Sequence, residues 1–287
     1  MTVTVGIVGA GFMGAGVGRA LLDGGAHVVT GVAGRSERTR RLIADAGLTT
    51  VDRLDDVLDA ADVILSIVPP AAALAVAGEV AGAVARTGRT PLFADLNAIA
   101  PPTVEAVADL LADLDVVDGS ISGPPPDRSP GATVYFSGPR AAEIAGLPWN
   151  GSIEPVIVSD RIGAASAVKM CTASVYKGLG ALMTNALATA HTHGVVDLVV
   201  GDLGRMLDPV DKVALSASKA DRFVGEMLEI AATQRDAGLS PALFEAVAEV
   251  WRAVATTELA HTAPEDVGRN ADAQAVVRRL RTGELAS

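Results

Sequence analysis

The chain has 287 residues, of which 49% are hydrophobic and 20% are charged. This balance is typical of a globular protein with about two domains, and it excludes a disordered or collagen-like chain. The formal net charge of −11 argues against a general nucleic-acid binder.

The basic residues and the single cysteine give further information on the class of protein. Only four of the 23 basic residues are lysines (Lys169, Lys177, Lys212 and Lys219), and the others are arginines. A single cysteine excludes an intrachain disulfide and fits a reducing, cytoplasmic compartment. The first positive charge is Arg19, so we expect no signal peptide. The apolar run Gly178–Val196 contains Thr, Asn and His, which favours a buried helix over a membrane span.

Strand-like and helix-like segments alternate through the first half of the chain. The expected strands are Val3–Val8, His27–Val32, Val63–Val68, Pro91–Asp95 and Val116–Ser120. The expected helices are Gly11–Asp23, Ser36–Asp45, Leu54–Ala60, Ala71–Ala85 and Thr103–Ala112, followed by a loop at Gly123–Gly131. Such alternation predicts βαβ units and a parallel sheet with helices on both faces, which is a Rossmann-type α/β domain.

The second half of the chain reads as all-helical. The expected helices are Ile162–His193, Val195–Leu207, Pro209–Asp236, Pro241–His261 and Pro264–Arg281. We therefore predict an N-terminal Rossmann domain over residues 1–160 and a helical domain over residues 161–287. We expect no metal site, because His191 and His193 lie two residues apart and do not share a helix face.

A G-x-G-x-x-G motif lies directly after the first predicted strand and opens a helix. Its residues are Gly9, Gly11, Phe12, Met13 and Gly14, with Ala10 between the first two glycines. The first glycine permits a tight turn, the second lets the backbone approach a pyrophosphate, and the third lets the helix pack close to the strand. The motif predicts a dinucleotide site. An ordinary glycine turn and an S-adenosylmethionine site are the alternatives.

The end of the second predicted strand indicates which cofactor binds. NAD sites usually have an Asp or Glu here, but residues 24–36 contain neither. Arg35 and Ser36 stand at this point instead, and an arginine suits a 2′-phosphate. We therefore expect NADP in preference to NAD. Arg38, Arg40 and Arg41 follow, and at least two of them are expected to form a solvated helix face.

Lys169 lies among small apolar residues of a predicted helix. Burial would lower the pKa of its ammonium group, which suits a proton donor or acceptor near neutral pH. A lysine that extends to solvent or to a subunit surface is the alternative.

Five segments in order resemble the β-hydroxyacid dehydrogenase superfamily, which includes hydroxyisobutyrate dehydrogenases, 6-phosphogluconate dehydrogenase and imine reductases. They are Gly6–Gly14, Ser66–Pro70, Asp95–Pro101, Asp118–Gly123 and Gly163–Lys169. The segments Lys169–Gly178 and Arg222–Met227 are similar to a less characterised branch with its own helical C-terminal domain. The resemblance implies a homodimer, an active site in a cleft between domains and a catalytic role for Lys169.

The resemblance also implies site residues in the other segments. Those expected to bind cofactor, besides the glycine loop, Arg35 and Ser36, are Val68, Pro69 and Asn97. Those expected to bind substrate are Ser120, Ser122, Gly123, Thr172, Tyr176 and Arg222. Tyr176 is included because it follows Lys169 by seven residues and so lies near the same helix face.

Two departures from the family pattern bear on the substrate. Thr172 and Ala173 stand where the family has an Asn or a His-Asn pair, which argues against a sugar phosphate. Pro124, Pro125 and Pro126 replace residues that offer backbone N–H groups in the substrate loop. We predict an NADP-dependent oxidoreductase acting on a small hydroxy acid, keto acid or aldehyde. An imine reductase and a non-catalytic NADP-binding module remain alternatives.

Overall fold

A computed structural model describes residues 2–125, 131–204, 209–264, 267 and 271–280. The chain divides into two compact units, Met1–Met170 and Cys171–Ser287. The division lies within helix α7 (Ala164–Thr192), whereas the sequence places a boundary after residue 160. Lys169 therefore belongs to the N-terminal unit, although its helix continues into the helical one.

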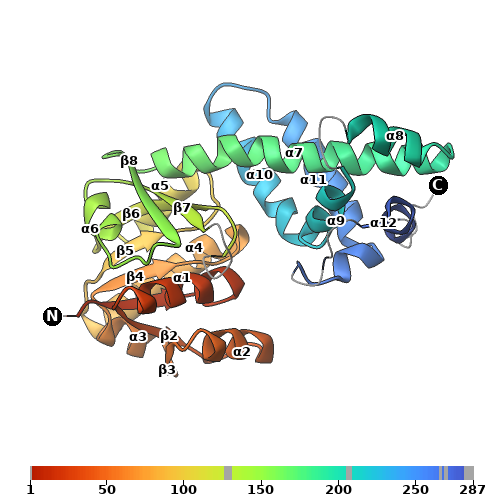
Figure 1. Cartoon of the computed structure of the whole chain (residues 1–287). Helices are drawn as coiled ribbons and strands as arrows, with labels where there is room; N and C mark the ends of the chain where they lie inside the picture. Colours follow the sequence, from red (N-terminus) through yellow and green to blue (C-terminus); the bar gives the residue numbers. More distant parts are fainter. Residues whose placement is uncertain (1, 126–130, 205–208, 265–266, 268–270, 281–287) are drawn as a thin grey trace. The chain divides into compact units, whose positions relative to one another are not determined.

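A single eight-stranded sheet forms the centre of the N-terminal unit (Figure 1). Its strands are β1 (Thr4–Val8), β2 (His27–Gly31), β3 (Thr49–Val51), β4 (Val63–Ser66), β5 (Leu92–Asp95), β6 (Val116–Ser122), β7 (Ala132–Ser137) and β8 (Ile153–Ser159). The strand order is β3-β2-β1-β4-β5-β6-β7-β8. The chain thus winds outward from β1 in both directions, as in a doubly wound Rossmann sheet. The Rossmann prediction is confirmed.

The far end of the sheet differs from the sequence prediction. Strands β1 to β6 are parallel to one another, but β7 is antiparallel to β6, and β8 is parallel to β7. The prediction of a parallel sheet is confirmed for β1 to β6, whereas neither β7 nor β8 was predicted from the sequence. Antiparallel pairing of β6 and β7 needs no crossover helix between them. This pairing places β7 beside β6, where its side chains reach the start of α7.

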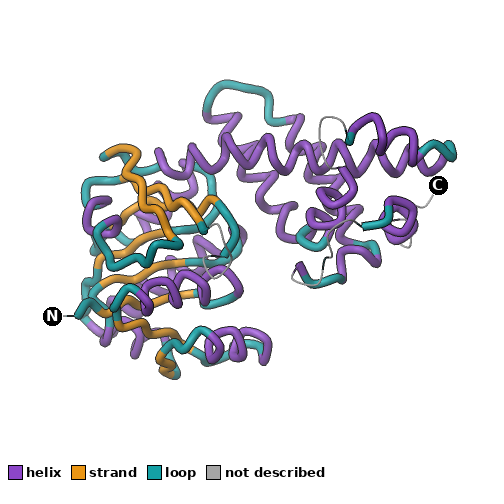
Figure 2. Tube along the Cα trace, viewed as in Figure 1, coloured by secondary structure: helices purple, strands orange, loops and turns teal. Residues whose placement is uncertain are grey.

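Helices cover both faces of the sheet (Figure 2). The helices are α1 (Phe12–Asp23), α2 (Glu37–Asp45), α3 (Leu54–Ala60), α4 (Ala73–Thr87), α5 (Pro101–Leu110) and α6 (Ala141–Ala145), with a 3₁₀ turn η1 (Pro70–Ala72). One apolar core contains side chains from α1, α2 and α6, and the other contains side chains from α3, α4 and α5. The two cores fix the sheet between helix layers and leave the carboxyl ends of the strands for the connecting loops.

The second unit is helical throughout its described residues (Figure 2). After α7 come α8 (Val196–Leu203), α9 (Pro209–Ala217), α10 (Ala220–Asp236), α11 (Ala242–Ala255), the 3₁₀ turn η2 (Glu258–His261) and α12 (Ala273–Leu280). The predicted single helix Pro209–Asp236 is two helices, because the chain turns at Ser218 and Lys219. The predicted helix Pro264–Arg281 is shorter, beginning at Ala273, and its last residue lies outside the described residues.

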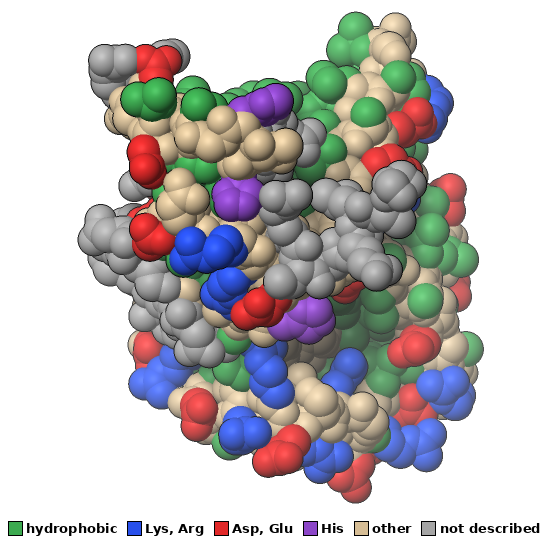
Figure 3. Space-filling model, turned by 90° about the vertical axis from the view of Figure 1, so that its right-hand side faces the viewer, with side chains coloured by type: hydrophobic (Ala, Val, Ile, Leu, Met, Phe, Trp, Pro, Cys, Tyr) green, Lys and Arg blue, Asp and Glu red, His purple; other side chains and the backbone are tan. Residues whose placement is uncertain are grey.

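Among the helices of the described residues, none combines the length and the apolar character needed to cross a lipid bilayer. The face drawn in Figure 3 carries basic and acidic side chains next to one another, with hydrophobic side chains between them.

Candidate active site

The glycine loop after β1 has the geometry of a dinucleotide site. Gly9 has φ 94°, and a Cβ added there would lie 2.3 Å from the main-chain oxygen of Ile67. A Cβ at Gly14 would lie 2.3 Å from the oxygen of Gly9. In contrast, a Cβ at Gly11 would meet nothing within 4 Å, and Gly11 caps the N-terminus of α1 without a side-chain hydrogen bond. The loop therefore leaves an open cradle at a helix N-terminus, which fits a pyrophosphate.

The first helical residues after this cradle have different surroundings. Phe12 and Met13 begin α1 and are partly buried, and Met13 packs against the core on that face of the sheet. Their predicted contribution to the cofactor site is therefore through the start of α1, whose first N–H groups have no helical partner.

A cavity of ≈ 420 Å³ lies between the ends of β2 and β3 and helix α4. Arg35, predicted from the sequence to bind the 2′-phosphate, lines this cavity and is exposed. Arg40 holds the backbone around it, because its guanidinium donates to the carbonyls of Arg35 and Val32 at 3.1 and 3.2 Å. Ser36 caps α2 by accepting from the N–H of Thr39 at 3.2 Å. The volume suits the adenosine end of a dinucleotide, and we name this space the adenosine cavity.

A buried polar network joins the ends of β4 and β5. The Asn97 side chain is buried, and its Oδ1 accepts from the N–H of Val68 at 2.6 Å. Its Nδ2 donates to Asp95 at 2.8 Å and to Ser66 at 3.2 Å. Asn97 thus positions the loop at Val68 and Pro69, which is where both residues were predicted to meet the cofactor. Burial raises the pKa of Asp95 to about 7, although two hydrogen bonds from Asn97 oppose the rise.

Asp118 on β6 holds the beginning of α7. Its carboxylate is fully buried and accepts from the N–H groups of Gly163 and Ser166, both at 3.0 Å. It also accepts from the Ser166 hydroxyl at 2.7 Å and from the Ser137 hydroxyl of β7 at 2.8 Å. Four donors from β7 and from the start of α7 therefore converge on one carboxylate, which accepts from an N–H group in the first turn of α7 and fixes that turn.

Lys169 lies one and a half turns into this anchored helix. Its side chain is partly buried, and its Nζ donates to the carbonyl oxygen of Ile121 at 2.7 Å. Ile121 precedes Ser122 and Gly123 of the predicted substrate loop, and Gly123 has φ 133°. The ammonium group is thereby held at the end of β6, on the same edge of the sheet as the glycine loop and the Asn97 network.

Comparison with known proteins gives a match in each of the two units. Residues 4–145 match the NAD binding domain of 6-phosphogluconate dehydrogenase, and residues 190–254 match a domain of unknown function, DUF1932. The chain thus contains an NAD-binding domain like that of 6-phosphogluconate dehydrogenase, followed by a DUF1932 domain. The first match supports an NAD(P)-dependent oxidoreductase, and the second lies within the helical unit.

Individual proteins are also similar to this chain. An uncharacterised 28.5 kDa protein from Methanothermus fervidus is 25% identical over 171 residues, which cover 60% of this chain and 64% of that relative, less than two thirds of its length. The 3-hydroxyisobutyrate dehydrogenase of Mycobacterium tuberculosis has a TM-score of 0.67 at 19% identity, covering 98% of this chain and 100% of that one. An imine reductase from Streptomyces aurantiacus has a TM-score of 0.54 at 20% identity, covering 92% and 98%. The two solved structures establish a shared fold.

The helical unit contains an ion cluster around the buried Glu226 side chain. The Glu226 side chain is 4% exposed, pairs with Lys177 and accepts from Arg222 Nε at 2.9 Å. The ring of Phe223 lies 5.2 Å from Lys177 Nζ and 5.6 Å from the Arg222 guanidinium carbon. Arg222 is therefore engaged with Glu226, and its predicted contact with substrate remains a prediction.

The remaining substrate-binding predictions fall in different surroundings. Thr172 and Tyr176 are exposed on α7, and Lys212 Nζ lies 5.3 Å from the centre of the Tyr176 ring. Ser120 is fully buried, and its hydroxyl donates to the carbonyl of Ala165 at 2.8 Å, so this group fastens α7. Ser122 is partly buried and Gly123 is exposed, while Pro126 of the loop lies outside the described residues.

Several residues that organise the site were not predicted from the sequence. They are Asp118, Ser137 and Ser166 around α7, and Arg53, Asp55 and Arg86 at the adenosine cavity. The Asp118-Gly119 pair stands within a segment that carries the family resemblance, which is the one signal that points to it. Ser137 and Arg86 carry no such signal, since their partners are 19 and 31 residues away in sequence.

Proposed function

We propose that this protein is an NADP-dependent oxidoreductase acting on a small hydroxy acid, keto acid or aldehyde, with Lys169 as the proton donor and acceptor. The observation that carries the proposal is the Lys169 ammonium group, held 2.7 Å from the Ile121 carbonyl at the end of β6. The anchored start of α7 and the cradle at Gly11 supply the fixed geometry that such a reaction needs.

When bound, NADPH would supply a hydride to the carbonyl carbon of the substrate. Lys169 donates a proton from Nζ to the carbonyl oxygen, so that the product is an alcohol. In the oxidation direction the neutral amine of Lys169 takes the hydroxyl proton. The Ile121 carbonyl orients Nζ, and a lysine suits this role because its ammonium group can lose a proton, which an arginine does not do.

The preference for NADP rests on the charge at the adenosine cavity. Arg35 lines the cavity, and residues 24–36 contain no Asp or Glu that would bind the ribose hydroxyls of NAD. Phosphate on the 2′-hydroxyl adds negative charge next to this guanidinium, which favours NADP.

Two other functions make distinct predictions. An imine reductase transfers hydride to a C=N carbon, and it is supported here by Thr172 and Ala173, which lack the amide or imidazole expected for sugar acids. A binding module without turnover retains the glycine loop but does not require Lys169.

The deciding experiment mixes the purified protein with NADPH and a panel of small aldehydes, keto acids and cyclic imines, and follows the loss of NADPH absorbance. We expect turnover of at least one carbonyl compound, and Lys169→Ala to lower kcat by about 10²–10⁴-fold without weakening NADPH binding. Lys169→Arg keeps the charge but not the transferable proton, and we expect a similar loss. Full activity of Lys169→Ala would refute the mechanism. Turnover of imines alone would establish the second function, and tight NADPH binding without turnover the third.

A further inference from the structure

Three arginines lie at the adenosine cavity, and the sequence pointed to only one of them. Arg35, Arg53 and Arg86 all line it, together with the acidic residues Asp52, Asp55 and Glu79. Backbone pairing fixes their proximity, because the N–H groups of Val32 and Ala33 after β2 donate to the carbonyls of Val51 and Asp52 at the end of β3. Arg53 is the residue after Asp52, so it lies beside the segment that leads from β2 to Arg35.

The backbone of Arg53 is held in place while its side chain is exposed. Its N–H donates to Asp56 Oδ2 at 2.9 Å, at the N-cap of α3. Its side chain is 70% exposed, and its Nη2 lies 3.5 Å from Asp55, which is a weak ion pair at the surface. The Arg53 guanidinium is thus held at the cavity through the main chain. Binding an anion would replace only the weak ion pair with Asp55.

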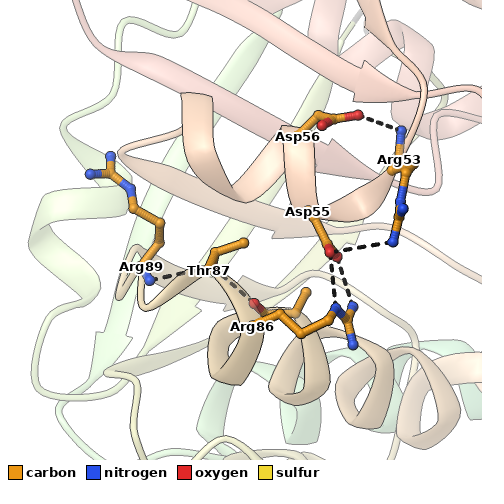
Figure 4. A network of polar contacts seen from close by, with 7 residues as sticks. Arg53, Asp55, Asp56, Arg86, Thr87 and Arg89 are labelled. Atoms are coloured by element: carbon orange, nitrogen blue, oxygen red, sulfur yellow. Dashed lines mark hydrogen bonds and ion pairs between the residues drawn. The ribbon is translucent and has the colours of Figure 1, made fainter.

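Asp55 is already engaged by a better partner (Figure 4). Arg86 of α4 donates from Nε and Nη2 to the two oxygens of Asp55, at 2.9 and 2.7 Å. This forked pair is the favoured geometry for an arginine and a carboxylate, and the hydrogen bonds from Arg86 lower the pKa of Asp55. Arg86 therefore neutralises a carboxylate that would otherwise hold Arg53 and repel a phosphate.

We propose that Arg53 is a second binding residue for the 2′-phosphate of NADP, and that Arg86 keeps it available by holding Asp55. This inference rests on the proposed preference for NADP. It assigns specificity to a pair of guanidinium groups, one after β2 and one after β3, and it makes Arg86 a positioning residue that acts through Asp55. A phosphate with about two negative charges would then lie between Arg35 and Arg53.

The test compares two fragments that differ by the 2′-phosphate, 2′,5′-ADP and 5′-AMP, by isothermal titration with the full chain. We expect Arg53→Ala to weaken 2′,5′-ADP binding about tenfold and to leave 5′-AMP within about twofold. The matched control is Arg89→Ala, because Arg89 is exposed nearby and its side chain points away from Asp55 in Figure 4. We expect this control to bind both fragments as the wild type does. Equal losses for the two fragments, or no loss, in Arg53→Ala would overturn the proposal.

The positioning role of Arg86 has its own test. Arg86→Ala leaves Asp55 without its main partner. Relative to the wild type, we expect this variant to lose more affinity for 2′,5′-ADP than for 5′-AMP. Adding Asp55→Ala removes the competing carboxylate, and the double variant is expected to recover at least half of the lost binding free energy. A merely structural ion pair would show no recovery, and that result would overturn the role of Arg86.

Failure of the inference can be told from failure of the proposed cofactor preference. If Arg35→Ala weakens 2′,5′-ADP selectively and Arg53→Ala does not, only the second binding residue is wrong. If the wild type binds both fragments equally, the preference for NADP and the inference fall together.

Discussion

Arg35 is the residue on which the proposed cofactor preference depends most directly. Because its guanidinium would pair with a doubly charged phosphate, we expect Arg35→Ala to weaken NADPH binding by about tenfold or more and NADH binding little. Fluorescence titration of both cofactors measures the two changes. Arg41→Ala is a suitable control, since Arg41 pairs with Glu37 on the surface of α2. Equal weakening of both cofactors by Arg35→Ala would contradict the prediction.

The protonation of Asp95, a hydrogen-bond partner of Asn97, makes the stability of the folded protein depend on pH. Its pKa rises from 3.8 to about 7 because burial disfavours the charged form. A raised carboxyl pKa means that the folded protein binds the proton more tightly than the unfolded chain does. The contribution of Asp95 to stability is therefore largest below about pH 4 and is lost as the pH rises toward 7.

The Asp95→Asn variant lacks this titration. We expect the wild type to lose stability relative to this variant between pH 5 and pH 7, as measured by denaturant unfolding at several pH values. Taking the difference between the two proteins cancels the other titrating groups. A difference that does not change with pH would show that Asp95 remains charged throughout. Asp113→Asn, an exposed carboxyl, serves as the control with no expected trend.

At the scale of elements, the start of α7 depends on one carboxylate. Asp118→Ala would leave two buried N–H groups and two hydroxyls without their acceptor, so we expect the unfolding free energy to fall by roughly 3 kcal/mol or more. Chemical denaturation measures the loss, with Asp113→Asn again as the exposed control. A loss below about 1 kcal/mol would show that other contacts fix α7.

The elements predicted well from the sequence are those with a strong local pattern. β1, β4 and β5 are buried apolar runs, and α1 follows the glycine motif. β3 was missed because it has three residues with little burial. β8 was missed because six of its seven residues are exposed or partly exposed, with Pro155 among them. β7 alternates buried and partly buried side chains, and its pattern could have been recognised. The break at Ser218 and Lys219 lacks Gly or Pro, so no local signal marked it.

In the candidate site, too, the residues that could be predicted are those that belong to a local sequence pattern. The glycine loop could be predicted because its chemistry is contained in six consecutive residues. The network around Asp118 could not, since its donors lie 19 to 48 residues away and meet only after β7 returns antiparallel to β6. The same holds for Asp55 and Arg86, which are 31 residues apart. Pairs of this kind are set by tertiary packing and leave no periodic pattern in the sequence.

For the whole molecule, the helical unit exposes apolar side chains that suit a second copy of the chain. Val175 and Leu182, seven residues apart on α7, are 65% and 64% exposed, and Leu198 of α8 is 76% exposed. Side chains at this spacing share a helix face. We propose that they contribute to a homodimer, as the family resemblance led us to expect.

Leu182→Glu places a charge on this face. We expect light scattering to show a dimer for the wild type and a shift toward monomer for the variant. Leu110→Glu, at an exposed leucine of the N-terminal unit, is expected to remain dimeric. A monomeric wild type, or a Leu182→Glu variant with unchanged mass, would contradict the proposal.

The rarity of lysine has a spectroscopic consequence. All four lysines lie between residues 169 and 219, and Lys169 alone belongs to the N-terminal unit. In a sample labelled with ¹³C only at lysine Cε, four side-chain resonances would represent the whole chain. Replacing Lys169 would assign one of them, and a pH titration of that resonance would report the protonation of the proposed catalytic group directly, with and without NADPH.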